Sequence, residues 1–237
     1  MFSRRSPETE IMDDLALGGE AMAQTLQELD TINTWLGGNK VVTDALSFLH
    51  QIPAGKPFFA RTLTVADLGC GGGDLLKVMA RWARKQNVRA KLTGIDANGY
   101  IVDYAAANCQ AYPEIGFQQQ DIFAPAFARQ PYDVMVCSLF CHHFTDEQLV
   151  VLFRQMYGQA RLGVIINDLH RHPLAYHSIH LLTSLFSKSY LVKNDAKLSV
   201  LRAFRKQELQ RLLAAAGITR YRLKWMWAFR WQLVMLK

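Results

Sequence analysis

The stretch Val65-Ala66-Asp67-Leu68-Gly69-Cys70-Gly71-Gly72-Gly73-Asp74 determines the fold. A short apolar run ends in a cluster of glycines, and an amphipathic segment follows, which is the order of a buried strand, a tight turn and a helix. Glycine tolerates positive φ and carries no Cβ, so the backbone of such a turn can approach a ligand closely. A plain connection between a strand and a helix does not need so many glycines, and we therefore interpret this loop as a ligand-binding turn.

The spacing of the glycines indicates the kind of ligand. Counted from Gly69, the dinucleotide fingerprint G-x-G-x-x-G requires a glycine where Asp74 stands, and the phosphate loop GxxxxGK[ST] is absent. The pattern is instead D-x-G-x-G-x-G, which begins at Asp67 and ends at Gly73. A carboxylate ahead of the glycines would repel a diphosphate, whereas it suits a ligand that carries an ammonium and a sulfonium.

Strands and helices alternate from Leu63 onward, which predicts βαβ units and a parallel sheet. We expect strands over Thr64–Leu68, Ala90–Ile95, Gly116–Gln120, Val134–Leu139 and Leu162–Asn167. Helices are expected over Leu75–Lys85, Tyr100–Cys109, Asp146–Gly158 and Lys206–Ala216. The runs Tyr221–Trp227 and Trp231–Leu236 predict a hairpin at one edge of the sheet. The predicted fold is α/β and doubly wound, with a mostly parallel seven-stranded sheet and an antiparallel C-terminal strand.

The first 52 residues read as helical. Apolar residues at helical spacing predict one helix over residues 8–36, a second over Val41–His50, and then a loop over Pro53–Pro57. A further helical segment, Pro173–Ser189, interrupts the strand–helix alternation. We therefore expect an N-terminal helical cap or substrate lid, residues 1–52, on a ligand-binding domain, residues 53–237, with a helical insert at about 172–200.

From about Leu63 onward the chain resembles the class I, Rossmann-like methyltransferases that use S-adenosyl-L-methionine. The resemblance implies that this cofactor is bound by Asp67, Gly69, Cys70, Gly71, Gly73, Asp96, Ala97, Asp121, Ile122, Phe123 and Ser138. In the family, the acid at Asp96 holds the ribose hydroxyls, the acid at Asp121 accepts from the adenine amine, and the two residues after Asp121 contact the ring. From the residues alone, Asp96 could instead cap the helix that begins near Tyr100, and Asp121 could be an ordinary turn residue.

His142 and His143 follow the predicted fourth strand, whose end borders the transferred methyl group in this family. An imidazole exchanges protons near neutral pH, so either histidine could be the general base for a hydroxyl acceptor, and we favour His143. Alternatively, one of them packs beneath or caps the helix that starts after Thr145. A metal site of these histidines with Asp168 and His170 is discounted, because neighbours on an extended segment point in opposite directions, and no metal is expected.

Three shorter motifs indicate the acceptor. Leu36-Gly37-Gly38, Asn167-Asp168-Leu169-His170-Arg171 and Leu201-Arg202-Ala203-Phe204 are similar to those of ubiquinone-biosynthesis-type methyltransferases. This implies a small, largely apolar acceptor such as a phenol, an enol, or a quinone-like or polyketide-like molecule. Residues expected to contact it are Trp35, His170, Arg171 and Tyr176.

The formal net charge of +7 is unevenly distributed and leaves a second function open. The acidic residues of the first 38 positions could dock on the basic residues after position 200, or the basic end could bind RNA. An RNA-modifying methyltransferase and a non-catalytic cofactor-binding protein are therefore the alternatives, although nucleic acid is the less favoured partner. No apolar run approaches the length of a membrane span, and the four cysteines lack metal-ligand spacing. A cytoplasmic protein with buried thiols, monomeric or homodimeric, is expected.

Overall fold

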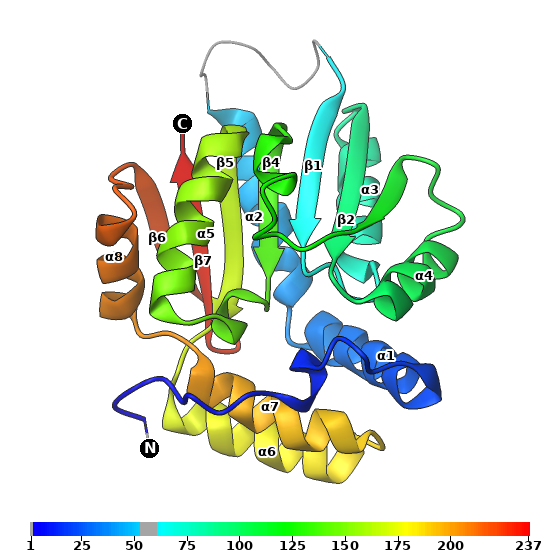
Figure 1. The fold of residues 1–237 in the computed structure, drawn as a ribbon, viewed down its shortest axis with the longest axis vertical. Coiled ribbons are helices and arrows are strands. Elements are labelled where there is room, and N and C mark those ends of the chain that lie inside the picture. The colour runs from blue at the N-terminus through cyan, green and yellow to red at the C-terminus, as the bar shows by residue number, and fades with distance from the viewer. Residues whose placement is uncertain (1, 53–60) are drawn as a thin grey trace.

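A mixed sheet forms the centre of the computed structural model, which describes residues 2–52 and 61–237. Its seven strands run in the order β3-β2-β1-β4-β5-β7-β6 (Figure 1). The bounds are β1 Leu63–Leu68, β2 Ala90–Asp96, β3 Ile115–Gln119, β4 Tyr132–Ser138, β5 Ala160–Leu169, β6 Tyr221–Met226 and β7 Arg230–Leu236. Strands β1 to β5 pair in parallel, and the predicted C-terminal hairpin pairs antiparallel through β7 with β5. The predicted fold class is confirmed, while the predicted loop Pro53–Pro57 lies outside the described residues.

Helices cover both faces of the sheet. They are α1 Gly19–Trp35, α2 Gly38–Gln51, α3 Asp74–Lys85, α4 Gly99–Asn108, α5 Asp146–Gln159, α6 Pro173–Phe186, α7 Tyr190–Arg202 and α8 Lys206–Ala215. One apolar core joins α2 and α3 to the sheet, and another joins α5 and α8 to its opposite face. Burial of these two cores is what holds the layers together.

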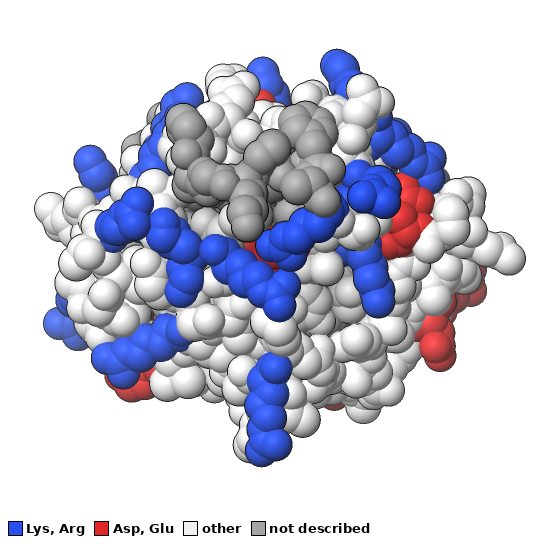
Figure 2. Space-filling model, turned by 90° about the horizontal axis from the view of Figure 1, so that it is seen from above, with Lys and Arg blue, Asp and Glu red and all other residues white. Residues whose placement is uncertain are grey.

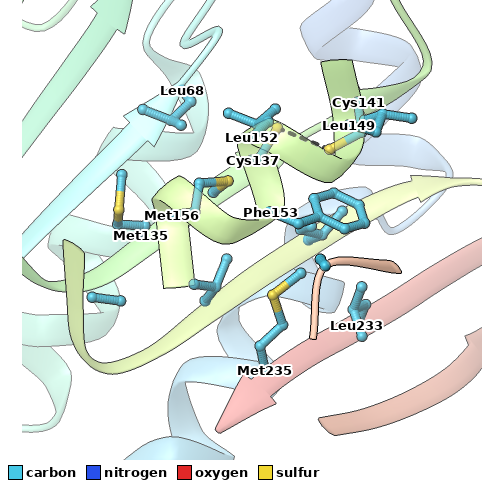
Figure 3. Close-up of a cluster of buried hydrophobic side chains, with 14 of the residues drawn as sticks. Leu68, Met135, Cys137, Cys141, Leu149, Leu152, Phe153, Met156, Leu233 and Met235 are labelled. Atoms are coloured by element: carbon cyan, nitrogen blue, oxygen red, sulfur yellow. Dashed lines mark hydrogen bonds between the residues drawn. The ribbon is translucent and has the colours of Figure 1, made fainter. Parts of the chain in front are cut away.

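The core beneath α5 is rich in sulfur. Met135, Cys137 and Met235 project from the strands toward Phe153 and Met156 of the helix (Figure 3). The Cys137 and Cys141 sulfurs lie 3.3 Å apart, too far for a disulfide. All four cysteines are free and buried, as expected from their spacing.

The strand order indicates where on the sheet a ligand binds. Strand β1 is followed in sequence by β2 on one side, and β4 lies on its other side, so the order reverses between β1 and β4. In open α/β sheets, ligands bind at the carboxyl ends of the strands beside such a reversal. The glycine loop after β1 and Ser138 at the end of β4 both lie at this point.

The N-terminal region differs from the predicted single helix over residues 8–36. A short turn of 3-10 helix covers Ile11–Asp13, and α1 begins only at Gly19. The glycine pair at the start of α1, Gly18 and Gly19, breaks the periodic pattern, because Gly19 has φ +75°. The preceding segment runs along α7 (Figure 1), where the Asp195 carboxylate accepts from the Ile11 and Met12 amides. Side-chain partners thus replace helical hydrogen bonds here.

The insert consists of two helices where the sequence predicted one segment. Helices α6 and α7 are separated at Ser187–Ser189, where the Glu28 carboxylate accepts from the Lys188 and Ser189 amides at 3.0 Å. The N-terminal segment, α1, α6 and α7 lie beyond the carboxyl ends of the parallel strands (Figure 1). Helix α2 instead packs against the sheet beside α3, in the same core. The division into a cap of residues 1–52 and a domain of residues 53–237 stays a prediction.

Much of the positive charge lies at the opposite end of the molecule. Figure 2 looks onto the end where the parallel strands begin, and lysine and arginine side chains predominate there. Arg61 and Arg161 both pair with the buried Asp133 at the start of β4, at this end of the sheet. Within the described residues, no helix is both long and apolar enough to span a bilayer.

Candidate active site

A cavity of about 1000 Å³ opens at the carboxyl ends of the strands. Its floor consists of the glycine loop and the residues that follow β2, β3 and β4, and its walls come from α1, α6, α7 and the β6–β7 turn. Most of the predicted cofactor residues line it: Asp67, Gly69, Cys70, Gly71, Asp96, Ala97, Asp121, Ile122, Phe123 and Ser138. The structure therefore brings together residues that the sequence places up to 71 positions apart, from Asp67 to Ser138.

The glycine loop adopts a conformation that other residues reach only with strain. Gly69, Gly71 and Gly73 have φ values of +66°, +50° and +78°. A Cβ on Gly69 would also fall 2.4 Å from Cγ of Phe140, so this position has no room for a side chain. Gly73 does not line the cavity, but it ends the turn before α3.

Two carboxylates meet beneath this loop without a compensating cation. Asp67 is buried and its Oδ1 has no hydrogen-bond partner. Burial and then the neighbouring charge of Asp96 raise the pKa of Asp67 well above its usual range. Burial likewise raises the pKa of Asp96, although backbone N–H groups partly oppose this. Two desolvated acids that repel one another favour a positively charged ligand over a diphosphate.

Asp96 does not cap the following helix. The Asn98 side chain is the N-cap of α4, because its Oδ1 accepts from the amides of Tyr100 and Ile101. Asp96 Oδ1 accepts from the Asn98 amide at 3.0 Å and faces the cavity. The capping alternative for Asp96 is wrong. Asp121 does take the turn role, since its Oδ1 accepts from the Phe123 amide at 2.8 Å, yet it also borders the cavity.

The two histidines stand side by side and do not point in opposite directions. Cys141–His143 form a turn of 3-10 helix, and the ring centroids of His142 and His143 lie 4.4 Å apart. The expectation of opposite directions was wrong because the chain leaves its extended conformation after Ser138. Neither imidazole caps α5, whose N-cap is Thr145.

Each imidazole is oriented by a carboxylate. His143 Nδ1 lies 2.5 Å from Asp13 Oδ1, and His142 Nδ1 lies 2.8 Å from Asp168 Oδ1. Burial raises the pKa of Asp13, but the hydrogen bond and the charge of His143, together with the Glu10 amide and Arg202, outweigh this and lower the pKa to about 2. Burial raises the pKa of Asp168, but the charge and hydrogen bond of His142, the Leu169 amide and the charge of His143 together outweigh it, so this pKa is also lowered. An ionised carboxylate can only accept, so each Nδ1 donates to its carboxylate.

The Nε2 atoms face the buried carboxyl of Glu10. The distance from His142 Nε2 to Glu10 Oε1 is 3.6 Å, and that from His143 Nε2 to Glu10 Oε2 is 3.9 Å. Burial raises the pKa of Glu10 to about 7, against the attraction of His143 and the hydrogen bond from Ser199. Glu10 Oε1 has no hydrogen-bond partner, and the Arg202 Nε lies 3.8 Å from it. A proton held among these groups would relieve the facing lone pairs.

Glu10, His142 and His143 are also the residues that could hold a metal ion within the described part of the chain. The set differs from the discounted one, because it takes Glu10 in place of Asp168 and His170. The positive charge of Arg202 beside Glu10 opposes a cation at this place.

Glu10 and Asp13 were missed by sequence reasoning. They precede the fold's glycine loop by more than 50 residues, and Arg202 binds Asp13 Oδ2 at 2.8 Å. The uneven distribution of charge along the chain could have indicated them, because it suggests that acidic N-terminal residues dock on basic residues later in the chain. None of Trp35, His170, Arg171 and Tyr176 lines the cavity. Trp35 is exposed, and Arg171 is buried in a network with Phe2, Ala203 and Glu208.

Known proteins share this fold. Residues 65–163 match a family described as a methyltransferase domain, and no curated protein sequence matches the chain. The magnesium protoporphyrin IX methyltransferase of Synechocystis PCC 6803, solved with bound SAH, is 19% identical over 87% of this chain and 86% of its own, with a TM-score of 0.54. The plantazolicin methyltransferase BpumL, solved with SAH and a substrate analogue, is 17% identical over 92% and 95%, with a TM-score of 0.63.

Human N-acetylserotonin methyltransferase, solved with SAM, is 20% identical over 91% of this chain but only 55% of its own, with a TM-score of 0.62. At these identities the structures establish the fold. The chain therefore has the fold of these S-adenosylmethionine-dependent methyltransferases, and residues 65–163 match the methyltransferase domain family. The matched region runs from within β1 to the first residues of β5, and it includes the glycine loop and the two histidines.

Proposed function

We propose that this protein transfers a methyl group from S-adenosylmethionine to an ionisable hydroxyl, phenol or enol, of a small and largely apolar molecule. The observation that supports binding of this cofactor is the pair of buried carboxylates, Asp67 and Asp96, beneath the glycine loop. When bound, S-adenosylmethionine supplies an electrophilic methyl group on a positively charged sulfonium. Asp96 would accept from its ribose hydroxyls, and Asp67 would lie on the side of its cationic part.

His143 supports the acceptor chemistry. Its side chain lines the cavity and is 17% exposed, whereas that of His142 is only 3% exposed. His143 Nε2 would take the hydroxyl proton as the new carbon–oxygen bond forms, and Asp13 would stabilise the resulting imidazolium. His142, fixed by Asp168, packs against the His143 ring and holds it in place.

Apolar walls favour an apolar acceptor. Leu29, Ile32, Ile179 and Leu182 line the cavity on the side of α1 and α6. Such walls exclude water and do not stabilise a positive charge. They therefore favour a step in which the charge of the sulfonium disappears. Alignment of nucleophile, methyl carbon and sulfur by this pocket would supply much of the acceleration.

Turnover with S-adenosylmethionine and a panel of phenols tests the proposal. His143→Ala should lower turnover about 10²–10⁴-fold, the usual contribution of a general base, with SAH affinity unchanged. His177→Ala, an exposed histidine on α6, is the matched control and should be active. Wild-type turnover in His143→Ala would contradict the base assignment.

Chelation separates the base from a metal site. Turnover after EDTA treatment should equal that of untreated protein, because Arg202 already places a positive charge beside Glu10. Loss of turnover on chelation, with recovery on adding Zn²⁺ or Mn²⁺, would assign Glu10, His142 and His143 to a metal instead.

A further inference from the structure

Arg230 is a buried arginine with unsatisfied donors. It begins β7 at the cavity edge and is 2% exposed. Among the described residues, neither Nε nor Nη1 of its guanidinium has a hydrogen-bond partner. Burial lowers the pKa of Arg230 to about 10, although Asp168 partly opposes this. An unpaired buried cation lowers stability, so such a residue is usually kept for a reason other than folding.

Arg171 shows what a structural arginine looks like in the same molecule. It is 1% exposed, yet its guanidinium donates to the carbonyls of Phe2 and Ala203 and to the Glu208 carboxylate. The charge of Asp168 acts on Arg230, but this carboxylate already pairs with the His142 imidazole and accepts from the Leu169 amide. Donors of Arg230 therefore remain for a ligand.

The side chains of Arg230 and Asn33 lie close to the backbone of Gly38. A Cβ on Gly38 would lie 2.9 Å from Cζ of Arg230 and 1.8 Å from Asn33 Oδ1, so both side chains approach the chain where only glycine fits. Asn33 Oδ1 also has no hydrogen-bond partner, and both residues line the cavity. A polar pair thus faces the cavity at the junction of α1, α2 and β7.

Aromatic side chains from the β6–β7 turn surround this pair. Trp225, Trp227 and Phe229 line the cavity, and Ala228 and Phe229 have φ values of +58° and +55°. The His170 amide donates to the Phe229 carbonyl at 2.7 Å and fixes the turn in this strained conformation. A flat organic molecule fits against such rings.

We propose that Arg230 binds a carboxylate carried by the methyl acceptor, so that the substrate class is an aromatic hydroxy acid. This inference rests on the proposed function for the identity of the acceptor. The planar guanidinium fork matches a carboxylate, and the apolar walls strengthen a charge-assisted hydrogen bond between them. The hydroxyl to be methylated and the carboxylate lie on one ligand, the first toward His143 and the second toward Arg230.

Two probes of the same shape test it: 1-hydroxy-2-naphthoic acid and 1-hydroxy-2-naphthamide. Their affinities are measured by calorimetry in the presence of saturating SAH. The wild type should bind the acid at least about tenfold more tightly than the amide, the smaller value of one charge-assisted hydrogen bond. Arg230→Met should abolish that preference while binding the amide and SAH as before. Arg220→Met, at an exposed arginine, should keep the preference.

Thermal unfolding without probes gives an independent measurement. Arg230→Met should melt at a higher temperature than the wild type, because an unpaired buried charge is removed. A lower melting temperature would make Arg230 structural. Equal or absent binding of both probes by the wild type, or an unchanged preference in Arg230→Met, would overturn the proposal. Failure of the proposed function would instead appear as loss of SAH binding in the wild type.

Discussion

Asp67 and Asp96 lie side by side at the ends of β1 and β2, yet their carboxylates differ in the hydrogen bonds that they accept. Asp96 accepts a hydrogen bond from the Asn98 amide, while Asp67 Oδ1 accepts none. Asp96 is also the more accessible of the two, since Asp67 is 1% exposed. At the scale of single residues, Asp96 is thus the acid whose removal tests ligand binding with little effect on the core.

Asp96→Ala should weaken SAH binding by about 1.5–3 kcal/mol, the range for hydrogen bonds to a charged group. Isothermal calorimetry measures the change, and Asp103→Ala, at an exposed acid on α4, is the control. Equal affinity in Asp96→Ala and the wild type would mean that this carboxylate does not contact the ligand.

The short turn Ile11–Asp13 carries Glu10 and Asp13 into the cavity, and its stability should depend on pH. The pKa of Glu10 in the folded protein, about 7, exceeds the ordinary value of 4.5 for a glutamate. Between these values the folded state holds a proton that the unfolded state releases, so the stabilising contribution is complete below pH 4.5 and is lost as pH rises through 7. Around Glu10 stand His142, His143, Asp13 and Arg202.

Glu10→Gln should therefore be more stable than the wild type at pH 8, by up to roughly 3 kcal/mol. The difference should shrink as the pH falls toward 4.5. Urea denaturation at several pH values measures it, and Glu20→Gln, at an exposed acid, should show no such trend. A constant difference across this range would show that Glu10 does not take up a proton on folding.

At this scale, local patterns predicted much and missed what distant contacts decide. The glycine loop and the alternation of strands and helices were readable because each depends on neighbouring residues. The helix over residues 8–36 was wrong, because Asp195 and Arg202 bind this segment from far along the chain. The orientation of His142 and His143 was missed for a similar reason, since a turn of 3-10 helix replaces the strand only where Asp168 and Asp13 hold the rings.

Viewed as a whole, the molecule carries a patch of basic surface side chains at the end opposite its cavity. Basic side chains gather where the parallel strands begin (Figure 2), and the cavity opens at the other end. An RNA substrate would have to place its phosphates and its methylated base at opposite ends of the sheet. This arrangement favours a small acceptor over RNA.

Tight RNA binding is therefore not expected. Fluorescence anisotropy with a labelled RNA hairpin should give only weak affinity at 0.15 M salt. Submicromolar affinity that fell steeply with added salt would reveal many phosphate contacts and would revive the RNA-modifying alternative.

The docking of Glu10 and Asp13 on Arg202 also constrains the order of events during synthesis. The ribosome releases the N-terminal segment long before Arg202 emerges, so the sheet can begin to form while the acids still lack their cation. A nascent chain that has completed β1 to β5 already has the glycine loop and the two histidines, but Glu10 and Asp13 still lack the arginine that binds them. The complete charged cluster therefore forms only when these two distant parts of the chain meet.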